Sequence, residues 1–278
     1  MRRPRPRAGL VAIAVAVMTA AAGLSACAGL PSSTAVQQGS LVGEPVLQPV
    51  QVQPDGPAPG ATPEQLVRGF LRAGGGGFDD DHAVARSFLA RSIKDQWQPD
   101  SGVTVYTGDP GLKVEALTPS TIRVTASVVA EVDRSGRYRE TPAGTSARAV
   151  FGVQKLGGSW RISDPPKGFG LWLSEDEMDR SYRSFTVAYV SKVSQTMVVD
   201  RRWFPITSGL ATTLARAQVA PVPEYLSGAA RTGIPAGTTL AVDSVPVQSG
   251  TAIVDLSAYA LLADPDARRP CGLSSSRP

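Results

Sequence analysis

The clearest pattern along the chain is an alternation of apolar and polar residues in "STIRVTASVVAEVD", positions 120–133. One face carries an apolar side chain at every second position: Ile122, Val124, Ala126, Val128, Ala130 and Val132. The other face carries polar side chains: Arg123, Thr125, Ser127 and Glu131. A period of two with one polar face is typical of a half-buried strand in an antiparallel sheet. We therefore expect such a sheet in the middle of the chain.

The same alternation returns in "SARAVFGVQKLGGSWRIS", positions 146–163. The pair Gly157-Gly158 between its two apolar runs predicts a two-residue hairpin turn, with Trp160 and Ile162 on the returning strand. A third segment, "FTVAYVSKVSQTMVVDRRWFP", is also typical of extended structure and leads to an expected domain boundary near residue 200.

Helical signals precede the sheet. In "TPEQLVRGFLRAG", Thr62 and Gln65 form a capping box, and Pro63 occupies the first helical position. The four glycines at 74–77 end this helix. A second helix is expected from Asp79 to Ile93, with three aspartates in its first turn, where negative charge suits the helix dipole.

Further elements are expected after the sheet. Ser174 and Glu177 form another capping box and predict a short helix, and a further helix is expected at about 209–219. Two strands, Leu240–Val247 and Thr251–Leu256, should pair through a Ser-Gly turn.

These elements predict an α+β fold. Two helices followed by a curved antiparallel sheet are typical of the NTF2-like group, which we expect over residues 62–200. The helix, loop and hairpin of residues 201–269 predict a second α+β domain.

The first 26 residues have the pattern of an export signal: four arginines, a short apolar block and small residues at the end. Leu24-Ser25-Ala26-Cys27 resembles the bacterial lipobox, in which the cysteine receives acyl chains that anchor the protein. The alternative is a soluble secreted protein with a coincidental cysteine. We expect lipidation of Cys27 and attachment to the extracytoplasmic face of the cell membrane. Residues 27–61 are rich in Pro, Gly and Gln and should form a disordered tether.

The net positive charge of the chain comes from the arginines of the leader. Residues 1–26 hold four of the 28 lysines and arginines and none of the 24 acidic residues, so the remaining chain is formally neutral. A neutral chain lacks the basic surface that nucleic-acid binding requires. If Cys27 is lipidated, Cys271 has no intramolecular partner, and no disulfide is expected.

The search for chemistry gives no catalytic constellation. His82, the single histidine, follows three aspartates and could imitate a metal site, but we expect a solvated helix start. The four glycines at 74–77 precede Phe78 and acidic residues, which favours a helix terminator over a phosphate loop. Asp243 and Asp255 should face solvent rather than act as an acid–base pair. The four tryptophans should serve packing rather than stacking: Trp97, Trp160, Trp172 and Trp203. We expect no enzyme activity, no metal and no cofactor.

The sequence of the second domain resembles a known domain family. The stretch containing Pro223-Glu224-Tyr225-Leu226, "IPAGTTL" at 234–240 and "GTAIVDLS" at 250–257 resembles the GerMN domain of germination proteins and actinobacterial lipoproteins. Together with the lipobox, "ARSFLARSIKDQWQPD" and "VVDRRWFP", the chain resembles the LpqB family of actinobacterial lipoproteins.

The resemblance implies an extracytoplasmic accessory protein that contacts the outer domain of the Mtr sensor histidine kinase and influences its signalling. It also implies a C-terminal β-propeller, which we expect to be absent from this chain. After Arg269 the chain ends in "PCGLSSSRP", so we interpret residues 270–278 as an aberrant tail from a frameshift or a truncated reading frame, and the GerMN-like domain as partial. The C-terminal third should then be weakly folded.

The resulting prediction is a non-enzymatic lipoprotein that regulates a sensor kinase. One alternative is a lipoprotein that holds an apolar or cell-envelope molecule in the NTF2-like cone. Another is an NTF2-like enzyme, which would need acid–base residues in the cone. An apolar cavity would favour the ligand-binding alternative, and a closed core with an exposed apolar patch would favour partner binding.

Overall fold

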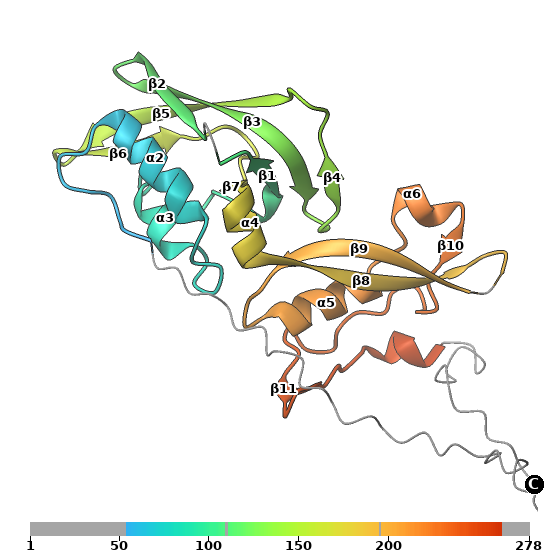
Figure 1. Ribbon diagram of the computed structural model, residues 1–278. Helices are drawn as coiled ribbons and strands as arrows, with labels where there is room; N and C mark the ends of the chain where they lie inside the picture. The colour runs from blue at the N-terminus through green and yellow to red at the C-terminus, as the bar shows by residue number, and fades with distance from the viewer. Residues whose placement is uncertain (1–53, 109–110, 195, 263–278) are drawn as a thin grey trace, which may run out of the picture. The chain divides into compact units, whose positions relative to one another are not determined.

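A computed structural model describes residues 54–108, 111–194 and 196–262 (Figure 1). These residues contain a seven-stranded sheet, a three-stranded sheet and a two-stranded hairpin, together with short helices. The expected α+β class is therefore confirmed. The export leader, Cys27, residues 27–53 of the expected tether and the tail at 270–278 lie outside the described residues.

The seven-stranded sheet is built around one long central strand, β3, which pairs antiparallel with four others. Its strands are β1 (Gly102–Tyr106), β2 (Lys113–Thr118), β3 (Thr121–Asp133), β4 (Tyr138–Glu140), β5 (Ser146–Leu156), β6 (Ser159–Asp164) and β7 (Leu171–Ser174). β6 pairs with β5, and β7 runs parallel to β1.

The alternation in β3 is confirmed position by position. All six predicted inward side chains of this strand are buried. The β5–β6 hairpin turns at Gly157-Gly158 as expected, with Leu156 opposite Ser159. Both glycines have positive φ, 55° and 83°, which the tight two-residue turn requires.

Helix α2 (Pro63–Gly74) contacts β2, β6 and β7, and its apolar stripe forms the core with the sheet. The Thr62–Gln65 capping box is present in full. Aromatic rings fill the space between helix and sheet: the ring centroids of Phe70 and Trp97 lie 5.0 Å apart, and those of Phe151 and Phe169 lie 5.1 Å apart.

The second predicted helix is wrong in its bounds. α3 spans only Ala83–Ser87, because Asp81 and His82 have left-handed φ values of 55° and 54°. The helix ends early because β6 forms hydrogen bonds with the backbone groups that a longer helix would need. Ile162 N–H donates to the Phe88 carbonyl at 2.9 Å, and Ala90 N–H donates to the Ile162 carbonyl at 2.7 Å.

The second sheet follows α4 (Glu175–Ser181), whose Ser174–Glu177 capping box is confirmed. The strands of this second sheet have the order β10-β8-β9. Its strands are β8 (Tyr182–Ser191), β9 (Met197–Pro205) and β10 (Ala230–Arg231). The expected extended segment therefore forms a hairpin, and the predicted boundary near residue 200 falls within β9.

Two helices accompany this sheet, α5 (Leu210–Val219) and α6 (Glu224–Ser227), and α5 confirms the predicted helix. The Gln218 side chain of α5 bonds both backbone groups of Ala188 in β8: its amide N–H donates to the carbonyl at 2.8 Å, and its carbonyl accepts from the N–H at 3.0 Å.

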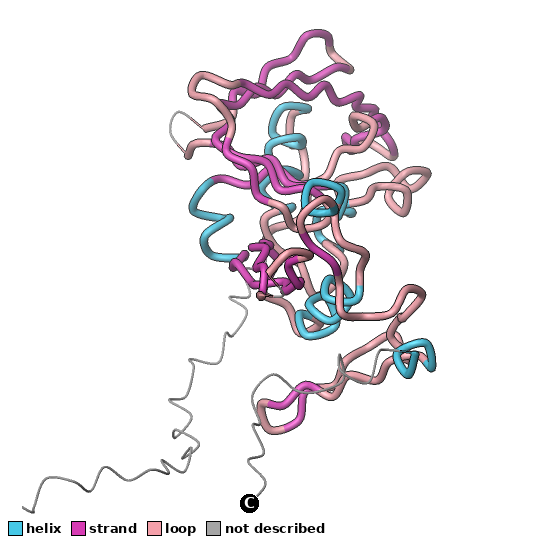
Figure 2. Tube along the Cα trace, turned by 90° about the vertical axis from the view of Figure 1, so that its right-hand side faces the viewer, coloured by secondary structure: helices cyan, strands magenta, loops and turns pink. Residues whose placement is uncertain are grey.

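The last described segment, residues 232–262, is mostly loop (Figure 2). The predicted hairpin is present at its turn, where β11 (Val247–Gln248) pairs with β12 (Thr251–Ala252). The strands are two residues long, shorter than expected, because Pro246 supplies no N–H and only Val245 of this region is a buried apolar residue. A short 3₁₀ helix, η2 (Ala258–Leu262), follows. None of the helices in the described ranges is long and apolar enough to span a membrane.

Candidate functional site

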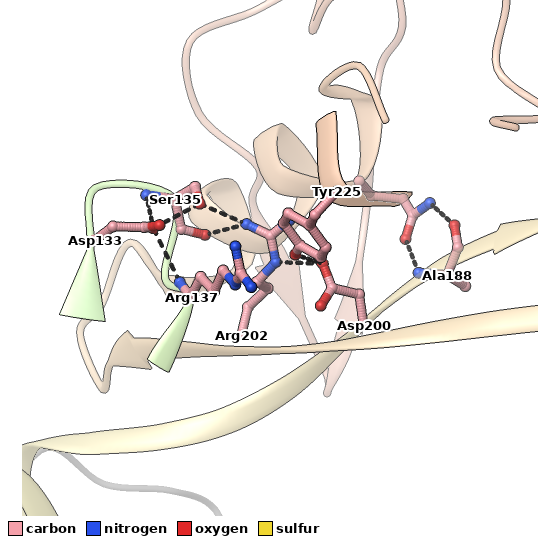
Figure 3. Close-up of polar contacts among 8 residues, drawn as sticks. Asp133, Ser135, Arg137, Ala188, Asp200, Arg202 and Tyr225 are labelled. Atoms are coloured by element: carbon pink, nitrogen blue, oxygen red, sulfur yellow. Dashed lines mark hydrogen bonds and ion pairs between the residues drawn. The ribbon is translucent and has the colours of Figure 1, made fainter. Parts of the chain in front are cut away.

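A polar network around one buried arginine connects the β3–β4 turn with β9 and α6 (Figure 3). Arg202 lies at its centre with a relative exposure of 5%. Its Nε donates to Asp200 Oδ2 at 2.6 Å, and its Nη1 donates to both the carbonyl and the Oγ of Ser135 at 2.7 Å. Burial alone would lower the pKa of Arg202, but the hydrogen bond and the charge of Asp200 outweigh burial and raise it.

Tyr225 covers the ion pair from α6. Its hydroxyl donates to Asp200 Oδ2 at 2.6 Å, so this carboxylate oxygen accepts from two side chains. The guanidinium of Arg137 lies 3.9 Å from the centroid of the Tyr225 ring, a cation–π contact. Desolvation, together with the hydrogen bond to Asp200, raises the pKa of Tyr225 to about 12, so the hydroxyl remains a donor.

Asp133 shapes the turn that carries Ser135 and Arg137. Its Oδ1 accepts from the Ser135 N–H at 2.9 Å, from the Ser135 Oγ at 2.6 Å and from the Arg137 N–H at 3.1 Å. Burial works to raise the pKa of Asp133, but these three bonds and the charge of Arg202 outweigh it and lower the pKa.

Backbone and ring contacts complete the connection. The Trp203 N–H donates to the Gly136 carbonyl at 2.7 Å, and the Tyr138 and Trp203 ring centroids lie 5.2 Å apart. Gly136 has a φ of 83°, and a Cβ there would lie 2.8 Å from the Phe204 ring. Only glycine fits this position without rearrangement.

We call Asp133, Ser135, Arg137, Asp200, Arg202 and Tyr225 the polar junction. Arg202 and Asp200 form its one ion pair among the described residues, and both side chains are largely withdrawn from solvent. Such an arrangement fixes the position of the β3–β4 turn on the second sheet.

His82 is not the solvated helix start that the sequence predicted. It is buried at 4% exposure, with its ring centroid 4.8 Å from that of Phe78 and 5.9 Å from that of Trp97. Burial lowers its pKa, although the Gly76 carbonyl and the charges of Asp100 and Asp81 oppose this. The imidazole therefore belongs to the aromatic core. Within the described ranges its Nδ1 has no hydrogen-bond partner.

The other candidates are where the sequence placed them. Gly75 caps α2, and its N–H donates to the Arg72 carbonyl at 3.1 Å, as expected of a helix terminator. Asp243 and Asp255 are both exposed. Among the residues described, no group of three or more His, Cys, Asp or Glu side chains could hold a metal ion. The tryptophans serve packing: Trp97 and Trp172 are buried, and Trp160 and Trp203 lie half-buried against the same core.

Sequence reasoning missed the polar junction. The available signal was "DRSGR" at 133–137, where an aspartate, a serine and a glycine directly after a strand are typical of a side-chain-stabilised turn. Nothing in the pattern pairs this turn with Arg202, 67 residues further on.

Comparison with known families gives two matches. Residues 56–179 match the N-terminal domain of lipoprotein LpqB, and residues 184–271 match a domain described as sporulation and spore germination. Lipoprotein LpqB of Cutibacterium acnes is 32% identical over 96% of this chain and 43% of that protein. The proteins of the same name from Thermobifida fusca and Bifidobacterium longum are 31% and 30% identical, over 97% and 89% of this chain and 44% of each relative.

The chain thus spans less than half the length of these relatives. No solved structure matches it, so the NTF2-like topology stays a prediction.

Proposed function

Since this chain belongs to the LpqB lipoprotein family, we propose that it is an extracytoplasmic lipoprotein, anchored through Cys27, that regulates a sensor histidine kinase without enzymatic activity. The kinase of the proposal is that of the Mtr system, which the resemblance in sequence implies.

One observation carries the proposal: both family domains follow, in order, a leader that ends in Leu24-Ser25-Ala26-Cys27. The leader provides export and acylation, and the residues between it and the first domain provide reach from the membrane. The relatives bear the name lipoprotein, which supports the anchor.

The interior of the first domain supports partner binding over the alternative of an apolar ligand in a cone. Phe70, Trp97, Phe151 and Phe169 contact one another between α2 and the sheet, and Phe70 and Phe151 are fully buried. Large apolar side chains are instead exposed on the second sheet, where Met197 and Val199 are 67% and 58% exposed. Exposed apolar side chains of this kind are typical of surfaces that bind proteins.

The anchor can be tested with the two cysteines of the chain. The Cys27→Ser variant should lose acyl labelling and move from the detergent phase to the aqueous phase on phase separation. Cys271→Ser is the matched control and should behave as the unmodified chain does. Continued labelling of Cys27→Ser would contradict the anchor.

The partner can be tested by calorimetry between residues 28–278 and the extracytoplasmic domain of the kinase, with circular dichroism as the control for folding. Binding would place the contact within these residues. Lack of binding by a folded sample would contradict the regulatory role proposed for this chain.

A further inference from the structure

A polar pocket of about 330 Å³ lies beside the C-terminal half of α2. Three elements supply its chemistry. Arg68 and Arg72 come from α2, Tyr106 ends β1, and Ser174 and Glu177 belong to the start of α4. None of these residues belongs to the polar junction.

The two arginines form the basic side of the pocket. They are four residues apart and so lie on the same side of α2, where like charges repel each other slightly. Both are exposed, and Arg68 Nη1 donates to the Leu112 carbonyl at 3.3 Å. In the ranges that the structure covers, neither guanidinium lies within 4.0 Å of a carboxylate, since both are missing from the ion pairs found there. With respect to the described residues, most of their donors are therefore available to a ligand.

Tyr106 supplies a third donor. Its hydroxyl is half-buried and lies within the electrostatic reach of Arg68, Arg72 and Glu177. Burial, and then the charge of Glu177, raises the pKa of Tyr106 to about 12, although both arginines oppose the rise. The hydroxyl therefore stays protonated at neutral pH.

Glu177 forms the acidic side. Its Oε2 accepts from the Ser174 N–H at 2.8 Å and from the Ser174 Oγ at 2.9 Å. Its Oε1 lies against Gly75, where a Cβ would come within 2.9 Å. This second oxygen, with the exposed carboxylate of Asp176, can accept hydrogen bonds from a ligand.

We propose that this pocket binds the phosphate group of a phosphorylated polyol. Two guanidinium groups and a phenol match the oxygens of a phosphate, for which arginine gives paired hydrogen bonds. The two carboxylates would repel a bare anion but accept hydrogen bonds from hydroxyl groups next to the phosphate. The pocket therefore selects a ligand that carries both.

The test is calorimetric titration of the full chain in detergent with glycerol 3-phosphate, inorganic phosphate and glycerol. Glycerol 3-phosphate should bind more tightly than either fragment. In the double variant Arg68→Gln/Arg72→Gln its affinity should fall at least about tenfold, since each charge-assisted bond lost corresponds to about that factor. The matched control Arg91→Gln/Arg148→Gln changes two exposed arginines outside the pocket and should bind normally.

A second variant separates the two sides of the pocket. Glu177→Gln keeps an oxygen for the capping box, so α4 should persist. It should weaken binding of glycerol 3-phosphate, because the carboxylate that accepts from the ligand's hydroxyl groups is lost. It should strengthen binding of inorganic phosphate, because a charge that repels the anion is removed. Undetectable binding of glycerol 3-phosphate at millimolar concentration, or equal affinities in the arginine double variant and its control, would overturn the proposal.

The source of the polyol phosphate can be distinguished with vesicles. Flotation of the Cys27→Ser chain with phosphatidylglycerol vesicles but not with phosphatidylcholine vesicles, abolished by Arg68→Gln/Arg72→Gln, would identify a lipid headgroup. Binding of glycerol 3-phosphate without flotation would identify a soluble ligand. Both outcomes support the site, and neither depends on the kinase contact.

Discussion

Arg202 is a cation with almost no access to solvent, and its position depends on one acid. The side chains of Arg202 and Asp200 are 6% and 12% exposed, and their atoms lie 2.6 Å apart. Removing one partner of such a pair leaves a buried charge without compensation, which costs far more than breaking a surface pair. The tyrosine hydroxyl on the same carboxylate adds to this dependence.

We therefore expect Asp200→Asn to lower the free energy of unfolding by about 3 kcal/mol, measured by urea denaturation. The matched control is Asp243→Asn, because Asp243 pairs with Arg216 at 3.6 Å while fully exposed. That control should change the free energy of unfolding by less than about 0.5 kcal/mol. Similar losses in the two variants would show that Arg202 finds other compensation.

Asp133 gives a prediction about pH. Its pKa is lowered in the folded chain from 3.8, so its carboxylate stabilises the fold at pH values above 3.8, and this contribution is lost as the pH falls through the lowered pKa. Asp133→Asn should therefore be less stable than the unmodified chain at pH 7. The difference in urea midpoint should shrink as the pH falls below 3.8. A difference that is constant with pH would mean that the charge of Asp133 is not involved.

At the scale of single residues, the helix caps were predictable and the burial of His82 was not. Thr62 and Ser174 were identified as caps because the partners of a cap lie three residues away. His82 was misjudged because its burial depends on Phe78 and Trp97, and nothing in the adjacent aspartates indicates where those rings lie.

At the scale of elements, tertiary hydrogen bonds decided where the predictions failed. β3 and the β5–β6 hairpin followed from their own sequence, since both pair with neighbours in the chain. α3 is shorter than predicted because Ile162, about 75 residues away, forms hydrogen bonds with the backbone of Phe88 and Ala90. The polar junction was missed for the same reason: its two halves are far apart in sequence.

The β3–β4 turn allows a test of its contact with β9. Gly136→Ala should lower the free energy of unfolding by about 2 kcal/mol or more, because the new Cβ meets Phe204 and the backbone is left-handed. Gly144→Ala is the matched control: Gly144 has a similar φ of 81° but has no atom within 4 Å of the added Cβ.

The control should therefore show only the cost of the backbone conformation, about 1 kcal/mol. Urea denaturation of both variants measures the difference. Equal losses would show that the turn does not rest tightly on Phe204.

At the scale of the whole molecule, apolar burial is distributed unevenly. The main core joins α2 and α3 to the seven-stranded sheet, whereas the separate buried cluster on the second sheet consists, among the described residues, of Val187, Tyr189 and Ala230. Residues 242–262 expose eight large apolar side chains: Val242, Val247, Ile253, Val254, Leu256, Tyr259, Leu261 and Leu262. This difference agrees with the weak C-terminal third predicted from the sequence, which remains to be measured.

Limited trypsin digestion under native conditions measures it. We expect cleavage after Arg216 and Arg231, both exposed, before any cleavage after Arg123, which lies in the central strand β3. Mass spectrometry of early fragments should then show a stable product that contains residues 62–181. Persistence of residues 200–278 as an intact fragment would contradict the prediction.

The amide of Gln218 has a consequence for association between chains. β10 pairs with β8 only at Val190 and Ser191, so the earlier part of that strand would present free backbone groups on this side. The Gln218 amide occupies one rung there by bonding both groups of Ala188. A strand from another molecule would have to displace this side chain before it could pair with the backbone of β8. Gln218 thus blocks the addition of a strand from another molecule at this position of β8.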